Sequence, residues 1–252
     1  MSTTAPGAPR LDFGEISLRE RERGFLLGGT GSGKTTLEEM LLADFNNRYA
    51  TSRILILDSK PRFRAEFLVN GVSAKRLFKY WKPGPFLPGS VLIRRASQLN
   101  DAWRLGAEIV IAQCELQSER KFLVDCAEEF FKSARHTRPQ LICVDETADF
   151  FHQNGSPISG SSDALIRVAR AGRERGTAAL YCTQRAKSIP GSIIEELTQL
   201  YLFVLDSKKD LGRCVEMGAP EDIQPPEHNY EFNLWTKRDR KKVYGPYKVS
   251  LP

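Results

Sequence analysis

An eight-residue, glycine-rich stretch constrains this chain more than any other feature of its sequence. Residues 28–35 read GGTGSGKT and fit the full pattern G-x-x-x-x-G-K-[S/T] of a phosphate-binding P-loop. A short apolar run at 24–27 precedes the stretch, and apolar residues at helical spacing follow it over 37–45. The sequence therefore predicts a strand, a loop and a helix in succession, which is the local structure that such a loop needs.

The stretch predicts a binding site for the phosphates of a nucleotide. Glycines let successive backbone N–H groups and a helix N-terminus point at one anion. We expect Lys34 to place its charge on the β and γ phosphates, and the Thr35 hydroxyl to ligate Mg²⁺. The candidate nucleotide-binding residues are Gly28, Gly29, Thr30, Gly31, Ser32, Gly33, Lys34, Thr35 and Thr36. An ordinary glycine-rich turn is the weaker alternative, because it would not need the flanking strand and helix.

Apolar runs alternate with helical patterns along the rest of the chain. We expect strands at 24–27, 53–58, 91–94, 108–112, 141–146, 177–183 and 200–205, and helices at 36–45, 98–105, 116–134, 164–175, 192–197 and 211–217. This alternation predicts an α/β fold with a mostly parallel central sheet flanked by helices. A β-hairpin is expected at the C-terminus, within residues 230–250.

We expect a single domain over residues 11–252, preceded by a disordered lead-in at 1–10. Residues 11–22 are expected to form an edge strand that leads into the P-loop strand. Residues 61–100 read as an irregular insertion with many basic and aromatic side chains. Such a segment can stack on single-stranded nucleic acid or pack its aromatic rings inward. We favour the second interpretation, because no periodicity supports the first.

Composition limits the classes of protein to which this chain can belong. Its 37 Lys and Arg exceed its 31 Asp and Glu, and the net charge of +6 favours polyanionic partners only modestly. The five cysteines lie far apart without a C-x-x-C pair, so we expect reduced, mostly buried thiols and no zinc site. No apolar run reaches the roughly 18 residues of a membrane span, so we expect no membrane insertion.

A second candidate cluster consists of polar residues at strand ends. Asp145 and Glu146 follow the most apolar run of the chain. There, Asp145 can hold Mg²⁺ while Glu146 activates the attacking water, which favours hydrolysis over phosphoryl transfer to a second substrate. Gln184 ends the next expected strand, where it can orient water or sense the γ phosphate; a surface amide is the alternative.

One block of sequence resembles a known family. Residues 171–185, AGRERGTAALYCTQR, resemble the signature of the FtsK/HerA superfamily of DNA-pumping ATPases: an arginine, a glycine, a buried strand and T-Q-[R/S/P]. The similarity continues through residues 189–191 and 205–210, and residues 58–60 match the D-x-K that follows the second strand in such proteins. The resemblance covers residues 24–218.

The resemblance implies a RecA-like core that uses ATP and Mg²⁺ and works as a homo-oligomeric ring, hexameric in the family, around double-stranded DNA. In the family, an arginine eleven positions before the sensor glutamine reaches into the ATP site of the neighbouring subunit. Arg173 is the matching position, and Arg170 and Arg175 are the alternatives.

The extent of the chain is similar to that of the genome-packaging ATPases of viruses and phages. The resemblance therefore implies an ATPase that packages double-stranded DNA, in the host cytoplasm or associated with the virion, with a capsid vertex or portal protein as a partner. A motor for conjugation or filamentous-phage export and a nucleotide-gated assembly protein without useful turnover are the alternatives. The candidate DNA contacts are Arg62, Arg64, Lys75, Arg76 and the charged run 237–242, for which a solvated hairpin tip is an equal expectation.

Overall fold

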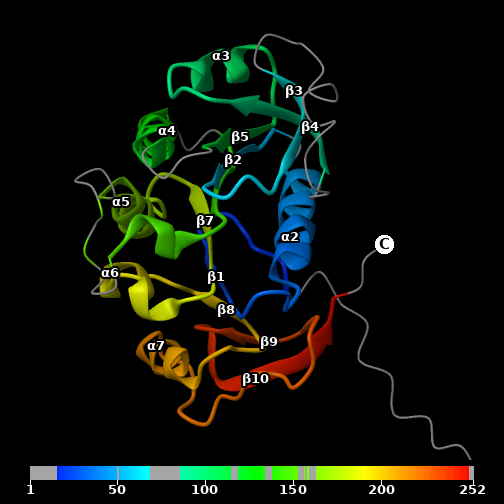
Figure 1. Cartoon of the computed structure of the whole chain (residues 1–252), viewed down its shortest axis with the longest axis vertical. Coiled ribbons are helices and arrows are strands. Elements are labelled where there is room, and N and C mark those ends of the chain that lie inside the picture. The colour runs from blue at the N-terminus through cyan, green and yellow to red at the C-terminus, as the bar shows by residue number, and fades with distance from the viewer. Residues whose placement is uncertain are drawn as a thin grey trace, which may run out of the picture.

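A computed structural model describes residues 16–49, 51–68, 86–114, 119–133, 138–152, 156, 158 and 163–249. The described residues form a ten-stranded sheet of order β10-β9-β8-β1-β7-β6-β2-β5-β4-β3 (Figure 1). The strands are β1 (Arg23–Leu27), β2 (Arg53–Asp58), β3 (Arg64–Leu68), β4 (Phe86–Ile93), β5 (Ile109–Gln113), β6 (Gln140–Val144), β7 (Thr177–Thr183), β8 (Gln199–Phe203), β9 (Glu231–Thr236) and β10 (Asp239–Lys248). The α-helices are α2 (Lys34–Arg48), α3 (Gln98–Arg104), α4 (Arg120–Ser133), α5 (Asp163–Ala171), α6 (Gly191–Ile194) and α7 (Leu211–Glu216).

The pairing confirms a mostly parallel α/β sheet. All strand pairs from β3 to β8 in the spatial order are parallel, whereas β9 runs antiparallel to both β8 and β10. The expected C-terminal hairpin is therefore β9–β10, and it extends the central sheet beyond β8 (Figure 1). Because the inner strands are buried on both faces, they read as continuous apolar runs in the sequence.

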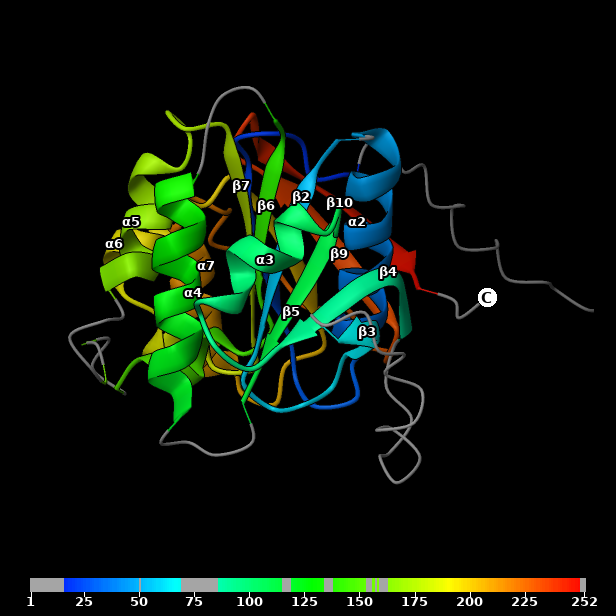
Figure 2. The same ribbon diagram turned by 90° about the horizontal axis from the view of Figure 1, so that it is seen from above.

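Helices cover both faces of the sheet, and each face has its own apolar cluster. Figure 2 shows α4, α5 and α6 on one side and α2 on the other. Alternate residues of β1 point to opposite faces: Phe25 and Leu27 belong to the cluster under α4 and α5, and Leu26 belongs to the cluster under α2. None of the helices among the described residues has the length and apolar character needed to cross a bilayer.

The segment before β1 differs from the prediction. Its described part, residues 16–22, is not a strand, and β1 pairs with β7 and β8 on its two sides. Ile16 and Leu18 are instead fully buried in the cluster under α2. The prediction of an edge strand was therefore wrong for these residues, because both neighbours of the P-loop strand are supplied from later in the chain.

Within residues 61–100, the structure has β3, the whole of β4, and the start of α3. Strand β4 pairs in parallel with both β3 and β5. The basic and aromatic stretch 75–82 and the proposed lead-in at 1–10 lie outside the described residues.

Helix α5 ends at Ala171, earlier than expected. A Cβ atom on Gly172 would lie 2.4 Å from the Val168 carbonyl oxygen, and Gly176 adopts a φ of +74°. The turn between α5 and β7 therefore depends on glycine.

Candidate nucleotide-binding site

The P-loop lies at the carboxyl edge of the sheet, between the end of β1 and the start of α2. The ends of the two neighbouring strands hold its backbone. The Gly28 N–H donates to the Thr183 carbonyl at 3.4 Å, and the Gly29 N–H donates to the Val204 carbonyl at 2.8 Å. The loop is therefore anchored on β7 and on the residue after β8, at the edge where parallel α/β sheets bind ligands.

Two glycines show why the loop needs its composition. Gly33 adopts a φ of +103°, which is strained for any residue with a side chain. A Cβ atom on Gly28 would lie 2.5 Å from Cβ of Phe203. One glycine therefore permits the turn into α2, and the other permits close approach to the neighbouring strand.

Two polar side chains of the loop suit a phosphate ligand. Lys34 is 7% exposed, and its ammonium group donates to the carbonyl oxygens of Gly28 and Gly29 at 2.7 Å each. The Ser32 hydroxyl oxygen is buried and has no hydrogen-bond partner among the described residues. A buried cation and a buried, unpartnered hydroxyl beside a turn of backbone N–H groups fit the oxyanions of a nucleotide.

Asp145 follows β6 and is buried at the same edge. One of its carboxylate oxygens lies 3.2 Å from an Arg62 guanidinium nitrogen, and the other is buried without a hydrogen-bond partner among the described residues. Burial raises the pKa of Asp145 well above its ordinary value, the neighbouring Glu38 carboxyl raises it further, and Arg62 opposes both effects. A buried carboxylate oxygen with a free lone pair, on the same edge as the Thr35 hydroxyl, fits the oxygen ligands that Mg²⁺ prefers.

Glu146 and Gln184 meet beside the P-loop. One carboxylate oxygen of Glu146 accepts hydrogen bonds from the Thr183 hydroxyl at 2.7 Å and from the Gln184 backbone N–H at 3.2 Å. The Gln184 side-chain oxygen accepts a hydrogen bond from the Thr30 hydroxyl at 3.0 Å. The spatial order β1-β7-β6 thus brings the P-loop, Gln184 and the Asp145-Glu146 pair to three adjacent strand ends.

Two basic residues after β2 cover the acids, and sequence reasoning missed this arrangement. The Lys60 ammonium group lies 3.6 Å from carboxylate oxygens of both Glu146 and Asp149. Arg62, expected among the DNA contacts, instead pairs with Asp145, and its side chain is 29% exposed. The D-x-K match at residues 58–60 includes Lys60, but the ion pairs of Lys60 and Arg62 with the acids after β6 depend on β2 lying next to β6.

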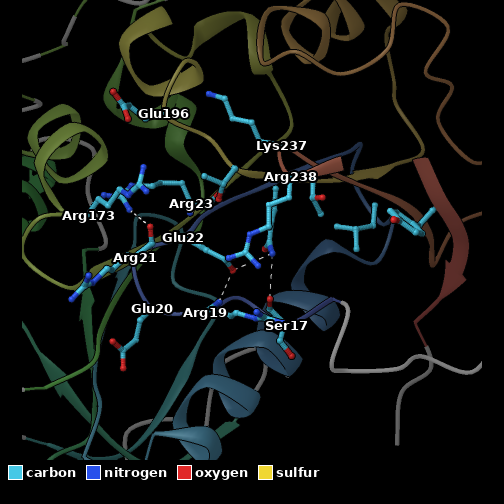
Figure 3. A pocket seen from close by; sticks show the side chains of 15 residues that line it. Ser17, Arg19, Glu20, Arg21, Glu22, Arg23, Arg173, Glu196, Lys237 and Arg238 are labelled. Carbon is cyan, nitrogen blue, oxygen red and sulfur yellow. Dashed lines mark hydrogen bonds and ion pairs between the residues drawn. The ribbon is translucent and has the colours of Figure 1, made fainter. Parts of the chain in front are cut away.

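Arg173 lies at the opposite edge of the sheet, in the turn between α5 and β7. The five residues of β1 separate the two edges by about 15 Å, so Arg173 does not meet Lys34 within one chain. Arg173 is exposed in a pocket with a volume of about 710 Å³, shown in Figure 3. The charged residues that line this pocket are Arg19, Glu20, Arg21, Glu22, Arg23, Arg173, Glu196, Lys237 and Arg238.

The alternative arginines differ in their surroundings. Arg175 donates to the Phe131 carbonyl at 3.1 Å, and its guanidinium carbon lies 4.4 Å from the centre of the Phe131 ring. Arg170 is exposed on the last turn of α5. All three arginines are exposed, and Arg175 in addition contacts Phe131 of α4.

Arg23 holds together the segments that carry Arg21 and Arg173. It is only 2% exposed. Its guanidinium group donates to the Ala169 carbonyl at 2.9 Å, to the Val168 carbonyl at 3.4 Å and, as the dashed line in Figure 3 marks, to the Arg21 carbonyl. The sequence did not indicate this role, because all three acceptors are backbone oxygens.

The charged run 237–242 is partly engaged within the chain. Lys237 donates to the Glu195 carbonyl at 2.8 Å, Arg238 pairs with Glu22 at 2.9 Å, and Lys242 lies over the Tyr244 ring. Arg64 is half-buried on β3, and the other two candidate DNA contacts, Lys75 and Arg76, lie outside the described residues.

All five cysteines are buried free thiols. Cys143 and Cys182 lie beside Glu38, and their potential metal-ligating atoms are within 4.8 Å of one another. Burial raises the pKa of Cys182 to about 12 and that of Cys143 well above its ordinary value. The Cys143 thiol donates to a carboxylate oxygen of Glu38 at 2.8 Å.

The fold and the site together define a RecA-like P-loop NTPase core. No family model matches the sequence, and no curated protein matches it. Among solved structures, the chain is similar to B204, the DNA-packaging ATPase from Sulfolobus turreted icosahedral virus, at a TM-score of 0.58 and 14% identity over 91% of this chain and 99% of that one.

The chain is also similar to the genome-packaging NTPase B204 from Sulfolobus turreted icosahedral virus 2 in complex with ATP-gammaS, with a TM-score of 0.57, 13% identity and coverage of 89% and 97% of the two chains. EccC (ATPases 2 and 3) from Thermomonospora curvata is similar with a TM-score of 0.51 and 13% identity, over 96% of this chain and 38% of that one. The similarity confirms the fold that the FtsK/HerA resemblance implied.

Proposed function

We propose that this chain is an ATPase that binds ATP with Mg²⁺ at the P-loop and uses hydrolysis to move double-stranded DNA. The observation that carries the proposal is the meeting of the P-loop, the Asp145-Glu146 pair and Gln184 at three adjacent strand ends. A phosphate site, a metal-binding carboxylate and a water-activating carboxylate are the parts that nucleotide hydrolysis requires.

Each residue has a distinct role in this proposal. Lys34 and the loop N–H groups bind the phosphates, and Thr35 and Asp145 hold Mg²⁺, which neutralises phosphate charge when bound. Glu146 accepts a proton from the attacking water. Gln184 orients that water, since its backbone and its side chain already link Glu146 with Thr30.

We propose that the active form is a ring of identical subunits, hexameric as in the resembling family. Arg173 would stabilise charge on the γ phosphate of a neighbour's ATP, an effect worth about 10³–10⁵ in rate for arginine fingers. Its distance from Lys34 within one chain supports action on a neighbour. The shared fold with B204 supports packaging of viral DNA, with a capsid vertex or portal protein as a further partner. Such a protein would work in the host cytoplasm or on the virion.

The test is ATP turnover by the purified protein, with and without double-stranded DNA, over a range of protein concentrations. We expect DNA to stimulate turnover and the rate per subunit to rise with concentration. Lys34→Ala should lose ATP binding, whereas Glu146→Gln should keep ATP bound without hydrolysis. Turnover that responds to neither variable would instead support a nucleotide-gated assembly protein.

The trans role of Arg173 has its own test. Arg173→Ala should be inactive alone, and mixing it with inactive Lys34→Ala subunits should restore turnover, because each variant supplies the part that the other lacks. Arg104→Ala is the matched control, since that side chain is 81% exposed on α3. No recovery on mixing would contradict the assignment of Arg173.

A further inference from the structure

Tyr230 lies directly against the P-loop, although it comes almost 200 residues later in the chain. Its backbone N–H donates to the Ser32 carbonyl at 2.7 Å, and its own carbonyl accepts from the Val249 N–H at 2.7 Å. A Cβ atom on Gly33 would lie 3.0 Å from both Cα and Cδ1 of Tyr230, so the aromatic ring touches the loop backbone. The residue is therefore anchored between the P-loop and the last strand.

The conformation of Tyr230 is unusual for an aromatic residue. Its φ is +65°, in the left-handed region, which is strained for a residue with a large side chain. Tyr230 is also 42% exposed, whereas Phe232, two residues later, is fully buried. The two backbone hydrogen bonds hold this strained position, and the result is an exposed ring beside the phosphate-binding loop.

An exposed aromatic ring beside the phosphate-binding loop can contact a nucleotide base, whereas it adds little to the buried core. The phosphates of a nucleotide would occupy the N–H groups of the loop, and the base follows after a single ribose. Aromatic side chains present flat, apolar faces, and stacking of a base on such a face is worth about 1–3 kcal/mol. The larger ring system of a purine gains more from stacking than that of a pyrimidine.

We propose that Tyr230 stacks on the base of the nucleotide whose phosphates bind residues 28–36, and that it favours purine nucleotides. This inference rests on the proposed function, because it needs a nucleotide in the P-loop. It adds a base-binding position that no sequence motif indicated. It also explains why the chain maintains a strained aromatic residue at the start of the C-terminal hairpin.

The experiment compares the affinities of ATP and inorganic tripolyphosphate by calorimetry, with Mg²⁺ present. Tyr230→Asn removes the ring and keeps a residue that tolerates positive φ, whereas Tyr230→Phe keeps the ring. We expect Tyr230→Asn to weaken ATP binding about 5- to 150-fold and to leave tripolyphosphate binding unchanged. Tyr230→Phe should bind ATP like the wild type, and wild-type affinity should be higher for ATP and GTP than for CTP and UTP.

Leu105→Ala is the control. Leu105 is another exposed large hydrophobic residue, with 67% of its surface exposed, and it directly follows the last residue of α3. Equal losses for ATP and tripolyphosphate in Tyr230→Asn would overturn the inference, because the residue would then act only by shaping the loop. Unchanged ATP binding in that variant would also overturn it. Wild-type protein that binds neither ligand would overturn the proposed function itself, which separates the two failures.

Discussion

Replacing Arg23 with methionine would test how much one buried guanidinium group contributes to this fold. In the native protein, that group donates to the carbonyl oxygens of Ala169, Val168 and Arg21. Methionine is shorter than arginine, but it keeps an unbranched apolar stem and a similar volume and has no donor. The variant therefore removes all three hydrogen bonds without leaving a large cavity.

The expected cost follows from the state of each acceptor. The Val168 carbonyl keeps its bond from the Gly172 N–H at 3.0 Å, so its loss is small. The carbonyls of Ala169 and Arg21 lose a charged donor, worth about 1.5–3 kcal/mol each. Burial lowers the pKa of Arg23, which shows that the native charge is partly desolvated, and methionine removes that cost. The net loss in the free energy of unfolding should therefore be about 3 kcal/mol.

Thermal and urea denaturation measure this loss. For a chain of this length, about 3 kcal/mol corresponds to a fall in Tm of roughly 6–12 °C. Arg104→Met is the matched control, because the Arg104 side chain is 81% exposed and pairs with Asp101 in an exposed ion pair that is worth little. The control variant should have the same Tm as the wild type.

A loss below about 1 kcal/mol in Arg23→Met would refute the reasoning, because it would mean that water replaces the guanidinium at its acceptors. The same variant should lower ATP turnover more than ATP binding, since Arg23 holds the turns that carry Arg21 and Arg173. Equal effects on binding and turnover would show that this edge of the sheet has no separate part in hydrolysis.

Three further predictions concern Arg62, Glu38 and the five cysteines. Arg62→Ala should strengthen Mg²⁺-dependent nucleotide binding, measured by Mg²⁺ titration, because Arg62 competes for Asp145; weaker binding would contradict this. Burial raises the pKa of Glu38 from 4.5 to about 7, so the folded state keeps a proton that the unfolded state releases, and stability falls as pH rises through this window. Glu38→Gln should therefore raise the Tm at pH 8 by roughly 7–14 °C and much less at pH 5, and equal shifts at both pH values would refute the cause. The five cysteines should react with an aromatic disulfide reagent only after unfolding, and rapid reaction of the native protein would contradict their burial.

The sequence alone predicted the features that depend on neighbouring residues. The P-loop, its flanking strand and helix, and the alternation of strands and helices all follow from spacing within short windows, because hydrophobic periodicity and loop composition are local properties. The α/β sheet and the C-terminal hairpin were therefore predicted correctly. The segment at 16–22 was not, because its burial under α2 depends on which strands flank β1.

Only the tertiary structure decided how distant residues combine. Strand order brings Arg62 to Asp145, 83 residues later, and so moves Arg62 from the expected DNA surface into the candidate site. Hydrogen bonds to backbone carbonyls hold Arg23, and a bond to Ser32 holds Tyr230, although neither residue belongs to a sequence motif. Backbone acceptors are the same at every position, so the sequence carries no mark of such contacts, and only the folded chain specifies them.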